Sequence, residues 1–161
     1  MTEETQIIAE PGAQEMFIIR EFDAPRTMVF KAFSDPDILQ QFYAPFDLSL
    51  VFNERDYRTG GRYSWSNKKG DKVVCTFAGV IHELTAPVRI VQTSEFMDLP
   101  ERGQVSLEIL TFEELPDNRT KLVIHGICPS LATRDAILNS GMDKGVKDIF
   151  VKLDRLLQKS Q

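Results

Sequence analysis

Six apolar segments separated by short turn-like stretches constrain the fold of this chain most strongly. Each segment lies between residues 48 and 127 and is rich in β-branched and aromatic residues, which favours strands. The separators, such as Thr59–Gly61 and Pro116–Asn118, contain turn-forming residues. Because such short connections cannot form a crossover, consecutive strands are expected to run antiparallel. The predicted strands are Leu48 to Asn53, Arg62 to Ser66, Val73 to Leu84, Ile90 to Phe96, Gln104 to Glu113 and Thr120 to Ile127.

A long amphipathic helix is predicted after these strands. Its apolar residues recur at intervals of three and four, so they form one stripe along a helix, while lysines and aspartates fall mostly elsewhere. Such a helix lies on an apolar surface, where it either seals a packed core or covers a pocket. The stripe comprises Met142, Val146, Ile149, Phe150, Leu153, Leu156 and Leu157.

The N-terminal part predicts one strand and two short helices. The segment Gln14 to Phe22 is typical of an edge strand, and Pro25 fits the first turn of a helix that follows it. The sequence Ser34 to Asp37 provides a cap and an early proline for a second short helix. These elements predict an α+β fold with the helices on one side of an antiparallel sheet. We expect residues 1–13 to be a flexible tail and residues 14–161 to form a single domain.

Composition excludes several classes of function. The chain has 161 residues and a net charge of -5, with no basic stripe that could neutralise a nucleic-acid backbone. Its apolar runs are far shorter than the roughly 20 residues that a membrane helix needs, and its acidic start does not resemble a secretory signal. A cytoplasmic location is therefore predicted. Cys75 and Cys128 sit singly in strand-like contexts, which favours reduced, buried thiols over a disulfide.

The stretch RDYRTGGRYSW, residues 55–65, raises the question of a phosphate-binding loop. Such a loop places its glycines between a strand and a helix start, whereas here the glycines lead into a strand. We therefore interpret Gly60 and Gly61 as a turn that requires unusual backbone angles, with Asp56 and Arg58 able to pair beside it.

The strand after this turn provides candidates for a pocket wall. Tyr63 and Trp65 share one face, and Phe77, Gly79 and Ile81 form a matching alternation on the next strand. If these faces look toward the C-terminal helix, they line either a packed core or a pocket. The missing side chain of Gly79 either leaves space or marks a bulge. The candidate cavity residues are Phe42, Tyr43, Tyr63, Trp65, Phe77, Ile81, Glu83, Phe96, Met142, Val146, Ile149 and Phe150.

Few polar residues are arranged for chemistry. His82 and His125 lie far apart without further ligands, so neither a metal site nor a cofactor is predicted. Glu83 shares parity with Ile81 and could be a carboxylate at a cavity mouth, where burial would raise its pKa. The favoured alternative is a salt bridge from Glu83 to Arg62 or Arg89. No nucleophile with a base beside it is recognisable, so no catalytic residue is predicted and enzyme activity is left uncertain.

Several motifs stand out in order along the chain, namely Phe22–Pro25, Val29–Ala32, Ser34–Pro36, Asp56–Gly61, Gly79–Leu84 with Pro87, and Gly141–Met142 with Gly145. Together they resemble one known family, the Hsp90 ATPase activator homologues of the START and polyketide-cyclase-like superfamily. The resemblance implies a helix-grip fold, in which a curved antiparallel sheet of about six or seven strands wraps around a long C-terminal helix, with two short helices after the first strand. It also implies a cavity between the sheet and this helix that takes an apolar small molecule. One departure is Phe42 to Pro45, where family members carry paired tryptophans and a Gly-Pro.

Three functions follow as hypotheses. The first is a domain that binds an apolar, lipid-like or aromatic small molecule. The second, implied by the resemblance alone, is a chaperone-interaction module that acts on a heat-shock ATPase. The third is a cyclase-like enzyme that uses Glu83 or a tyrosine as its acid-base group. The sequence leaves open whether the chain is a monomer or a homodimer.

Overall fold

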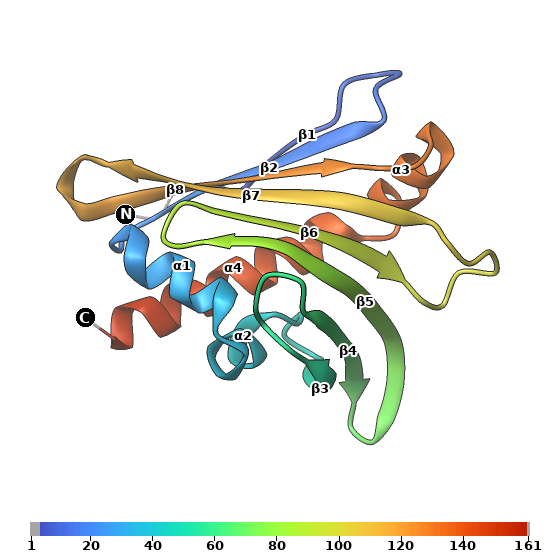
Figure 1. Ribbon diagram of the computed structural model, residues 1–161, viewed down its shortest axis with the longest axis horizontal. Helices are drawn as coiled ribbons and strands as arrows, with labels where there is room; N and C mark the ends of the chain where they lie inside the picture. The colour runs from blue at the N-terminus through green and yellow to red at the C-terminus, as the bar shows by residue number, and fades with distance from the viewer. Residues whose placement is uncertain (1–3, 161) are drawn as a thin grey trace.

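The computed structural model of the chain describes residues 4–160 and contains one large curved antiparallel sheet with a long helix along its concave side (Figure 1). The predicted α+β helix-grip fold is confirmed, and the described residues form eight strands where about six or seven were expected. The order across the sheet is β1-β2-β8-β7-β6-β5-β4-β3.

The central part of the sheet is the predicted meander. Each strand from β3 to β8 pairs antiparallel with the next strand along the chain, and all six predicted segments are strands. Their bounds are β3 Ser49–Arg55, β4 Arg62–Lys69, β5 Lys72–Thr85, β6 Arg89–Phe96, β7 Val105–Leu115 and β8 Arg119–Ile127.

The N-terminal strand β2, Glu15–Phe22, is not an edge strand, so that part of the prediction is wrong. It lies between β8 and a further short strand, β1, Gln6–Ile8. Within the expected flexible tail, these three residues therefore pair in the sheet, with Ile7 opposite Ile18, while residues 1–3 lie outside the described residues. A three-residue strand is too short to show a periodic pattern in the sequence.

Four α-helices are present in the described chain. In α2, Pro36 occupies the first turn and the Asp35 side chain accepts a hydrogen bond from the Asp37 N–H, as the capping pattern predicts. The helix α3 and a short 3-10 helix at Pro116–Asn118 were not predicted. The bounds are α1 Arg26–Ser34, α2 Pro36–Phe42, α3 Leu131–Leu138 and α4 Met142–Lys159.

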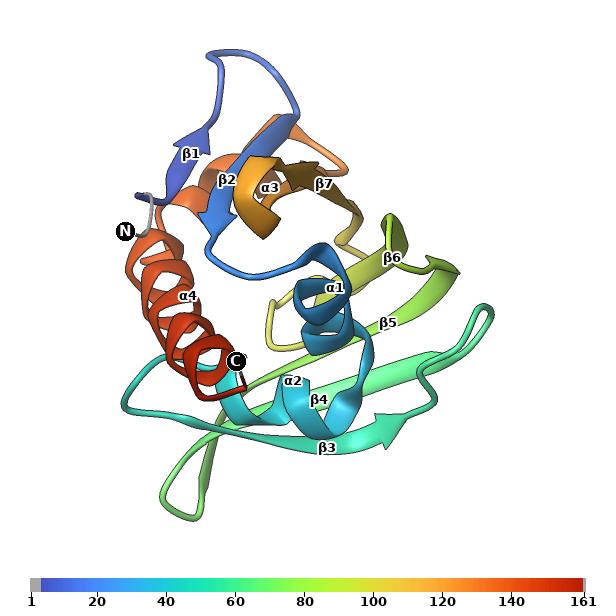
Figure 2. The same ribbon diagram turned by 90° about the vertical axis from the view of Figure 1, so that its left-hand side faces the viewer.

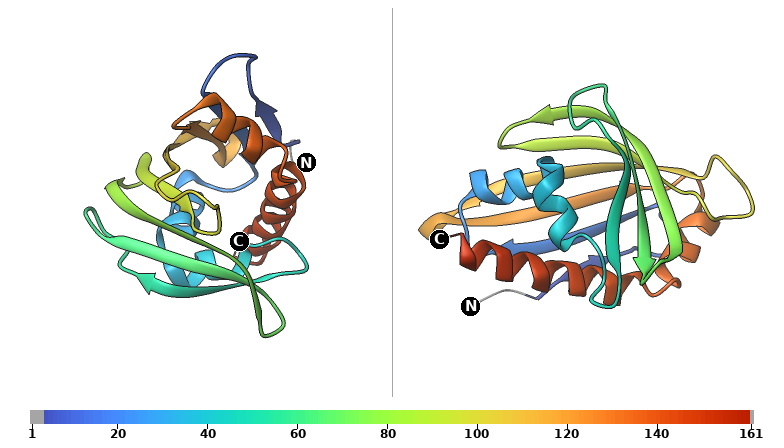
Figure 3. Two further views of the ribbon diagram at one scale, coloured as in Figure 1. Left: turned by 90° about the vertical axis from the view of Figure 1, so that its right-hand side faces the viewer. Right: turned by 90° about the horizontal axis from the view of Figure 1, so that it is seen from below.

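The sheet curls so far that α4 closes its open side, with α1 and α2 covering one end (Figures 2 and 3). At that end the core is tightly packed. Phe150 of α4 makes an edge-to-face contact with Phe22 at 5.4 Å, and Phe30 and Phe33 of α1 pack against Phe112 of β7. Aromatic pairs of this kind stabilise a core beyond their buried area.

The glycine pair in the loop between β3 and β4 forms a turn that is hydrogen-bonded to β5. Gly60 has a φ of 86°, and a Cβ on Gly61 would lie 1.9 Å from the Asp56 carbonyl oxygen. Gly60 donates a hydrogen bond to the Ile81 carbonyl, and the Ile81 N–H donates to the Gly61 carbonyl. Arg58 pairs with Asp56 at 3.0 Å beside the turn. The glycines therefore serve backbone geometry.

Across residues 4–160, no helix has the length and apolar character to cross a bilayer.

Candidate ligand pocket

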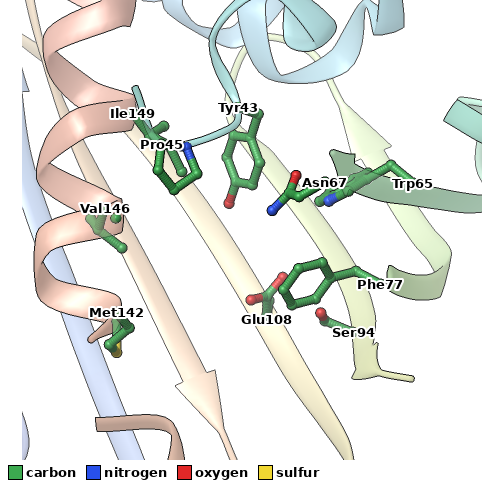
Figure 4. Close-up of a pocket in the computed structure, with 11 residues that line it drawn as sticks. Tyr43, Pro45, Trp65, Asn67, Phe77, Ser94, Glu108, Met142, Val146 and Ile149 are labelled. Atoms are coloured by element: carbon green, nitrogen blue, oxygen red, sulfur yellow. The ribbon is translucent and has the colours of Figure 1, made fainter. Parts of the chain in front are cut away.

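A pocket of about 220 Å³ lies between the concave face of the sheet and the first half of α4 (Figure 4). Residues from the segment that follows α2, from four strands and from α4 converge on it. Most are apolar or aromatic, and a few polar groups lie among them. The lining residues are Tyr43, Pro45, Trp65, Asn67, Phe77, Ser94, Glu108, Met142, Gly145, Val146 and Ile149.

The aromatic part of the wall comes from two neighbouring strands and the end of α2. Trp65 stacks on Tyr63 at 5.0 Å and meets Tyr43 edge-on at 5.4 Å. Phe77 lies opposite Trp65 in the β4–β5 ladder. Because alternate residues of a strand point to the same face, Trp65 and Asn67 both reach the pocket from β4.

The loop after α2 is fastened to α4. Lys152 donates hydrogen bonds to the carbonyl oxygens of Ala44, at 2.7 Å, and Pro45, at 3.3 Å, while the Phe46 N–H donates to Asp148. These contacts hold Tyr43 over the pocket. Burial, with a smaller contribution from Glu108, raises the pKa of the Tyr43 phenol, so it stays protonated. Its hydroxyl points into the pocket and bonds to no residue that the structure describes (Figure 4).

Glu108 is the carboxyl group of this wall. It lies on β7 directly opposite Gln92 of β6 and Gly126 of β8, and its Oε1 accepts a hydrogen bond from Gln92 Nε2 at 2.9 Å. No Lys, Arg or His of the described chain forms an ion pair with it. Burial raises the pKa of Glu108, and the hydrogen bond from Gln92 opposes this effect. A second, smaller pocket of about 100 Å³ adjoins the other side of Glu108 and Met142.

Residues 23–158 match the family described as "Activator of Hsp90 ATPase homolog 1-like protein". The chain belongs to this family. The family match covers the two short helices, the meander and nearly all of α4. No curated protein matches the chain closely enough to be counted as a relative.

Solved structures share this family fold at low sequence identity. A protein from Arthrobacter aurescens has a TM-score of 0.85 at 20% identity, covering 96% of this chain and 91% of its own. A protein from Rhodobacter sphaeroides has a TM-score of 0.85 at 18% identity, covering 97% of this chain and 99% of its own. A structure described as an HSP90 activator from Plasmodium falciparum has a TM-score of 0.60 at 20% identity, covering 91% and 97%. At these identities the likeness supports the fold alone.

The structure divides the twelve cavity candidates of this family member into three groups. Six line the pocket, namely Tyr43, Trp65, Phe77, Met142, Val146 and Ile149. Phe42, Tyr63, Ile81 and Phe150 are fully buried in the packed core, and Phe96 packs edge-on against Phe77 at 5.2 Å. The remaining candidate, Glu83, lies elsewhere.

Glu83 does not line the pocket, and the cavity-mouth hypothesis for it is wrong. A β-bulge between Ile81 and Glu83 shifts the register, so that the next core-facing residue after Ile81 is Leu84. Glu83 instead pairs with Arg89 at 2.8 Å, as the favoured alternative predicted. Hydrogen bonds from Arg89 and Thr85 hold the pKa of Glu83 below its usual value.

Gly79 leaves no open space either. The Tyr63 hydroxyl donates a hydrogen bond to the Thr93 carbonyl across this glycine. A Cβ on Gly79 would lie 2.0 Å from that carbonyl oxygen and 2.6 Å from the Tyr63 hydroxyl. The position is a close approach between neighbouring groups, and the bulge lies further along β5.

Five lining residues were missed: Pro45, Asn67, Ser94, Glu108 and Gly145. Glu108 alternates with the buried residues Leu110 and Phe112, so strand parity already directs it inward. Asn67 likewise follows Tyr63 and Trp65 at intervals of two.

Neither histidine lines the pocket. His82 is exposed, and His125 stacks on Phe17 at 4.3 Å.

Proposed function

We propose that this family member binds a small, largely apolar molecule in the pocket between the sheet and α4. The observation that carries the proposal is the pocket itself, in which aromatic and aliphatic walls surround the Glu108 carboxyl and the Tyr43 hydroxyl. A few polar groups that orient a ligand within an apolar cavity are typical of small-molecule sites. Its volume of about 220 Å³ lies below the ~300–1,000 Å³ of drug-sized sites. The proposed ligand is therefore about the size of a single ring.

A glycine in α4 supports the proposal. Glycine within a helix costs about 1 kcal/mol relative to alanine. At Gly145, an added Cβ would meet only the Pro45 ring at 3.6 Å, which is an ordinary contact. Packing therefore does not require glycine here, and its effect is to leave space at the pocket wall.

Trp65 provides a local probe of binding, because it lines the pocket and is the single tryptophan of the chain. We expect benzyl alcohol to change the Trp65 fluorescence in a saturable way, with a Kd on the order of 1 mM for so small a ligand. The variant Val146→Phe fills the pocket and is expected to abolish the response. The matched control Val151→Phe adds the same ring to the exposed face of α4 and is expected to bind as the wild type does.

Native mass spectrometry of gently purified protein completes this test, because a co-purifying adduct would disclose the chemical class of a natural ligand. The proposal is contradicted if the fluorescence responds equally in both phenylalanine variants, or if it does not saturate and no adduct is found.

A chaperone-interaction module is the second candidate, favoured by the family match and by the fold shared with the Plasmodium falciparum HSP90 activator. Its direct test is the ATPase rate of a purified Hsp90 with and without this chain. An unchanged rate together with no detectable binding would remove this candidate while leaving the pocket proposal intact.

A reducing compartment such as the cytoplasm is proposed as the location of the protein. Support comes from Cys75 and Cys128, which are both free thiols in the structure.

A further inference from the structure

We infer that the pocket selects a small organic cation, a protonated aromatic or aliphatic amine, and that the Glu108 carboxylate is its counter-ion. This inference rests on the proposed function and specifies the class of ligand. It follows from the charges of the residues that line the pocket, from the unused hydrogen-bond acceptor of Glu108 and from the aromatic rings around it.

The charges of the wall exclude anions. Among the described residues that line the two adjoining pockets, Glu108 is the one carboxylic acid and none is Lys, Arg or His. Lys152 of α4 and Arg134 of α3, the helices that contribute residues to these walls, are engaged elsewhere. Lys152 donates to the carbonyl oxygens of residues 44 and 45, and Arg134 donates to the Glu10 carbonyl and pairs with Asp135. A carboxylate ligand such as a fatty acid would therefore find no positive partner in the pocket.

Glu108 has unused capacity to bind a hydrogen-bond donor. Gln92 donates to Oε1, while Oε2 accepts no hydrogen bond from any described residue. Glu108 is half-buried, and its partial removal from water disfavours the charged form, which agrees with the raised pKa of this group. A ligand ammonium group beside Oε2 would supply the missing charge and at least one N–H donor.

Aromatic rings surround the same space at different angles. The planes of Tyr43 and Trp65 are inclined by 70°, and those of Trp65 and Phe77 by 45°. A cation within about 6 Å of such ring faces is attracted by their negative electrostatic potential, most strongly by tryptophan. The Tyr43 hydroxyl oxygen adds an acceptor on the wall opposite Glu108 (Figure 4). Glu108 and the Tyr43 hydroxyl oxygen therefore both offer acceptors to a cation, beside rings whose faces could attract it.

Three probes with the same ring test this inference, namely benzylamine, benzyl alcohol and benzoate, which are cationic, neutral and anionic at pH 7.5. Each is titrated against wild-type protein with Trp65 fluorescence as the readout. We expect benzylamine to bind about tenfold more tightly than benzyl alcohol, a difference of about 1.4 kcal/mol, because a hydrogen bond between two charged groups is stronger than one from a neutral hydroxyl. Benzoate is expected to bind most weakly.

The variant Glu108→Gln separates the charge from the shape of the pocket. We expect it to remove the preference for the amine, so that benzylamine and benzyl alcohol bind with about equal affinity. The matched control Glu83→Gln removes a carboxylate that pairs with Arg89 outside the pocket, so the preference for the amine should persist. Glu108→Asp, which keeps the charge, should restore part of the preference.

The outcomes distinguish the two proposals. If benzyl alcohol binds as tightly as benzylamine, or if Glu108→Gln keeps the preference for the amine, this inference is overturned and the proposed function stands. If none of the three probes binds, this inference is overturned, and the proposed function falls with it when native mass spectrometry finds no co-purifying adduct. Should Glu108→Gln fail to fold, the order of the three probes on wild-type protein still decides.

Discussion

The two halves of α4 carry the same apolar stripe but face different surroundings. In the second half, Phe150 and Leu153 are 2% and 0% exposed and lie in a closed aromatic core. In the first half, Met142, Val146 and Ile149 are only partly buried and line the pocket. One amphipathic helix therefore seals a core at one end and covers a pocket at the other.

The sheet accounts for this difference. On β7, the inward residues Leu110 and Phe112 are large and apolar, whereas Glu108, two residues before Leu110, is polar and has Gly126 beside it. Leu110 and Phe112 belong to the closed core that also contains Phe150, and Phe112 packs against α1 there, while a carboxyl group next to a glycine leaves space at the pocket. The stripe of α4 thus decides where the helix lies, and the sheet decides whether the space beneath it is filled.

The largest expected effect comes from truncating the closed half. Phe150→Ala should lower the free energy of unfolding by about 3–5 kcal/mol, because it removes a buried ring and leaves a cavity. Ile149→Ala, which truncates a pocket-facing neighbour, should cost about 1–2 kcal/mol, because less area and less packing are lost. Urea unfolding of both variants measures the contrast, and equal losses would mean that the two halves are equally well packed.

A second comparison concerns glycines of the sheet. Gly79→Ala places a Cβ against the Thr93 backbone and the Tyr63 hydroxyl, so we expect a loss of about 1–3 kcal/mol from overpacking. The control Gly126→Ala meets only Met16, its side chain at 3.6 Å and its carbonyl oxygen at 3.9 Å, which are ordinary contacts, so it should be nearly neutral. Thermal unfolding ranks the two, and a neutral Gly79→Ala would contradict the close approach described here.

The raised pKa of Glu108 predicts that the stability of the folded protein depends on pH. Because the pKa of Glu108 is raised in the folded state, the folded protein holds this proton more tightly than the unfolded chain does. The stability of wild-type protein relative to Glu108→Gln should therefore fall as the pH rises from the unfolded pKa through the folded one. Above that range, we expect Glu108→Gln to be the more stable of the two proteins.

Melting temperatures of both proteins between pH 4 and 8 measure this difference in the absence of ligand. The ionisable groups that face Glu108 are Tyr43, Tyr57, Tyr63 and Cys128, and burial raises the pKa of each, so they remain protonated over this range. A difference between the two proteins that does not depend on pH would show that Glu108 is not desolvated.

Much of the fold could be predicted because its patterns are long. The α4 stripe extends over four turns, and the strands of the meander alternate regularly enough to fix their faces, so Trp65 and Phe77 were correctly directed inward. The short β1 and α3 offered no such pattern. Strand alternation gave the wrong face for Glu83, because a single bulge after Ile81 moves each following residue of β5 to the opposite face of the sheet.

The pocket was harder to predict than its walls. Alternation with Leu110 and Phe112 could have directed attention to Glu108, but alternation cannot show whether an inward space is filled. At Gly79 that space is taken by the Tyr63 hydroxyl, whereas at Gly145 it remains open. Both are glycines facing the interior, and only the positions of side chains distant in sequence separate them.

Gly145→Ala has the smallest expected effect and tests this distinction most directly. The added methyl group meets only the Pro45 ring, so the gain in helix propensity should stabilise the protein by about 0.5–1 kcal/mol. The same methyl group enters the pocket wall and should weaken the binding of benzyl alcohol, as measured by Trp65 fluorescence. Greater stability with weaker binding would show that the chain sacrifices helix stability for an open pocket, whereas lower stability or unchanged binding would show that Gly145 serves packing alone.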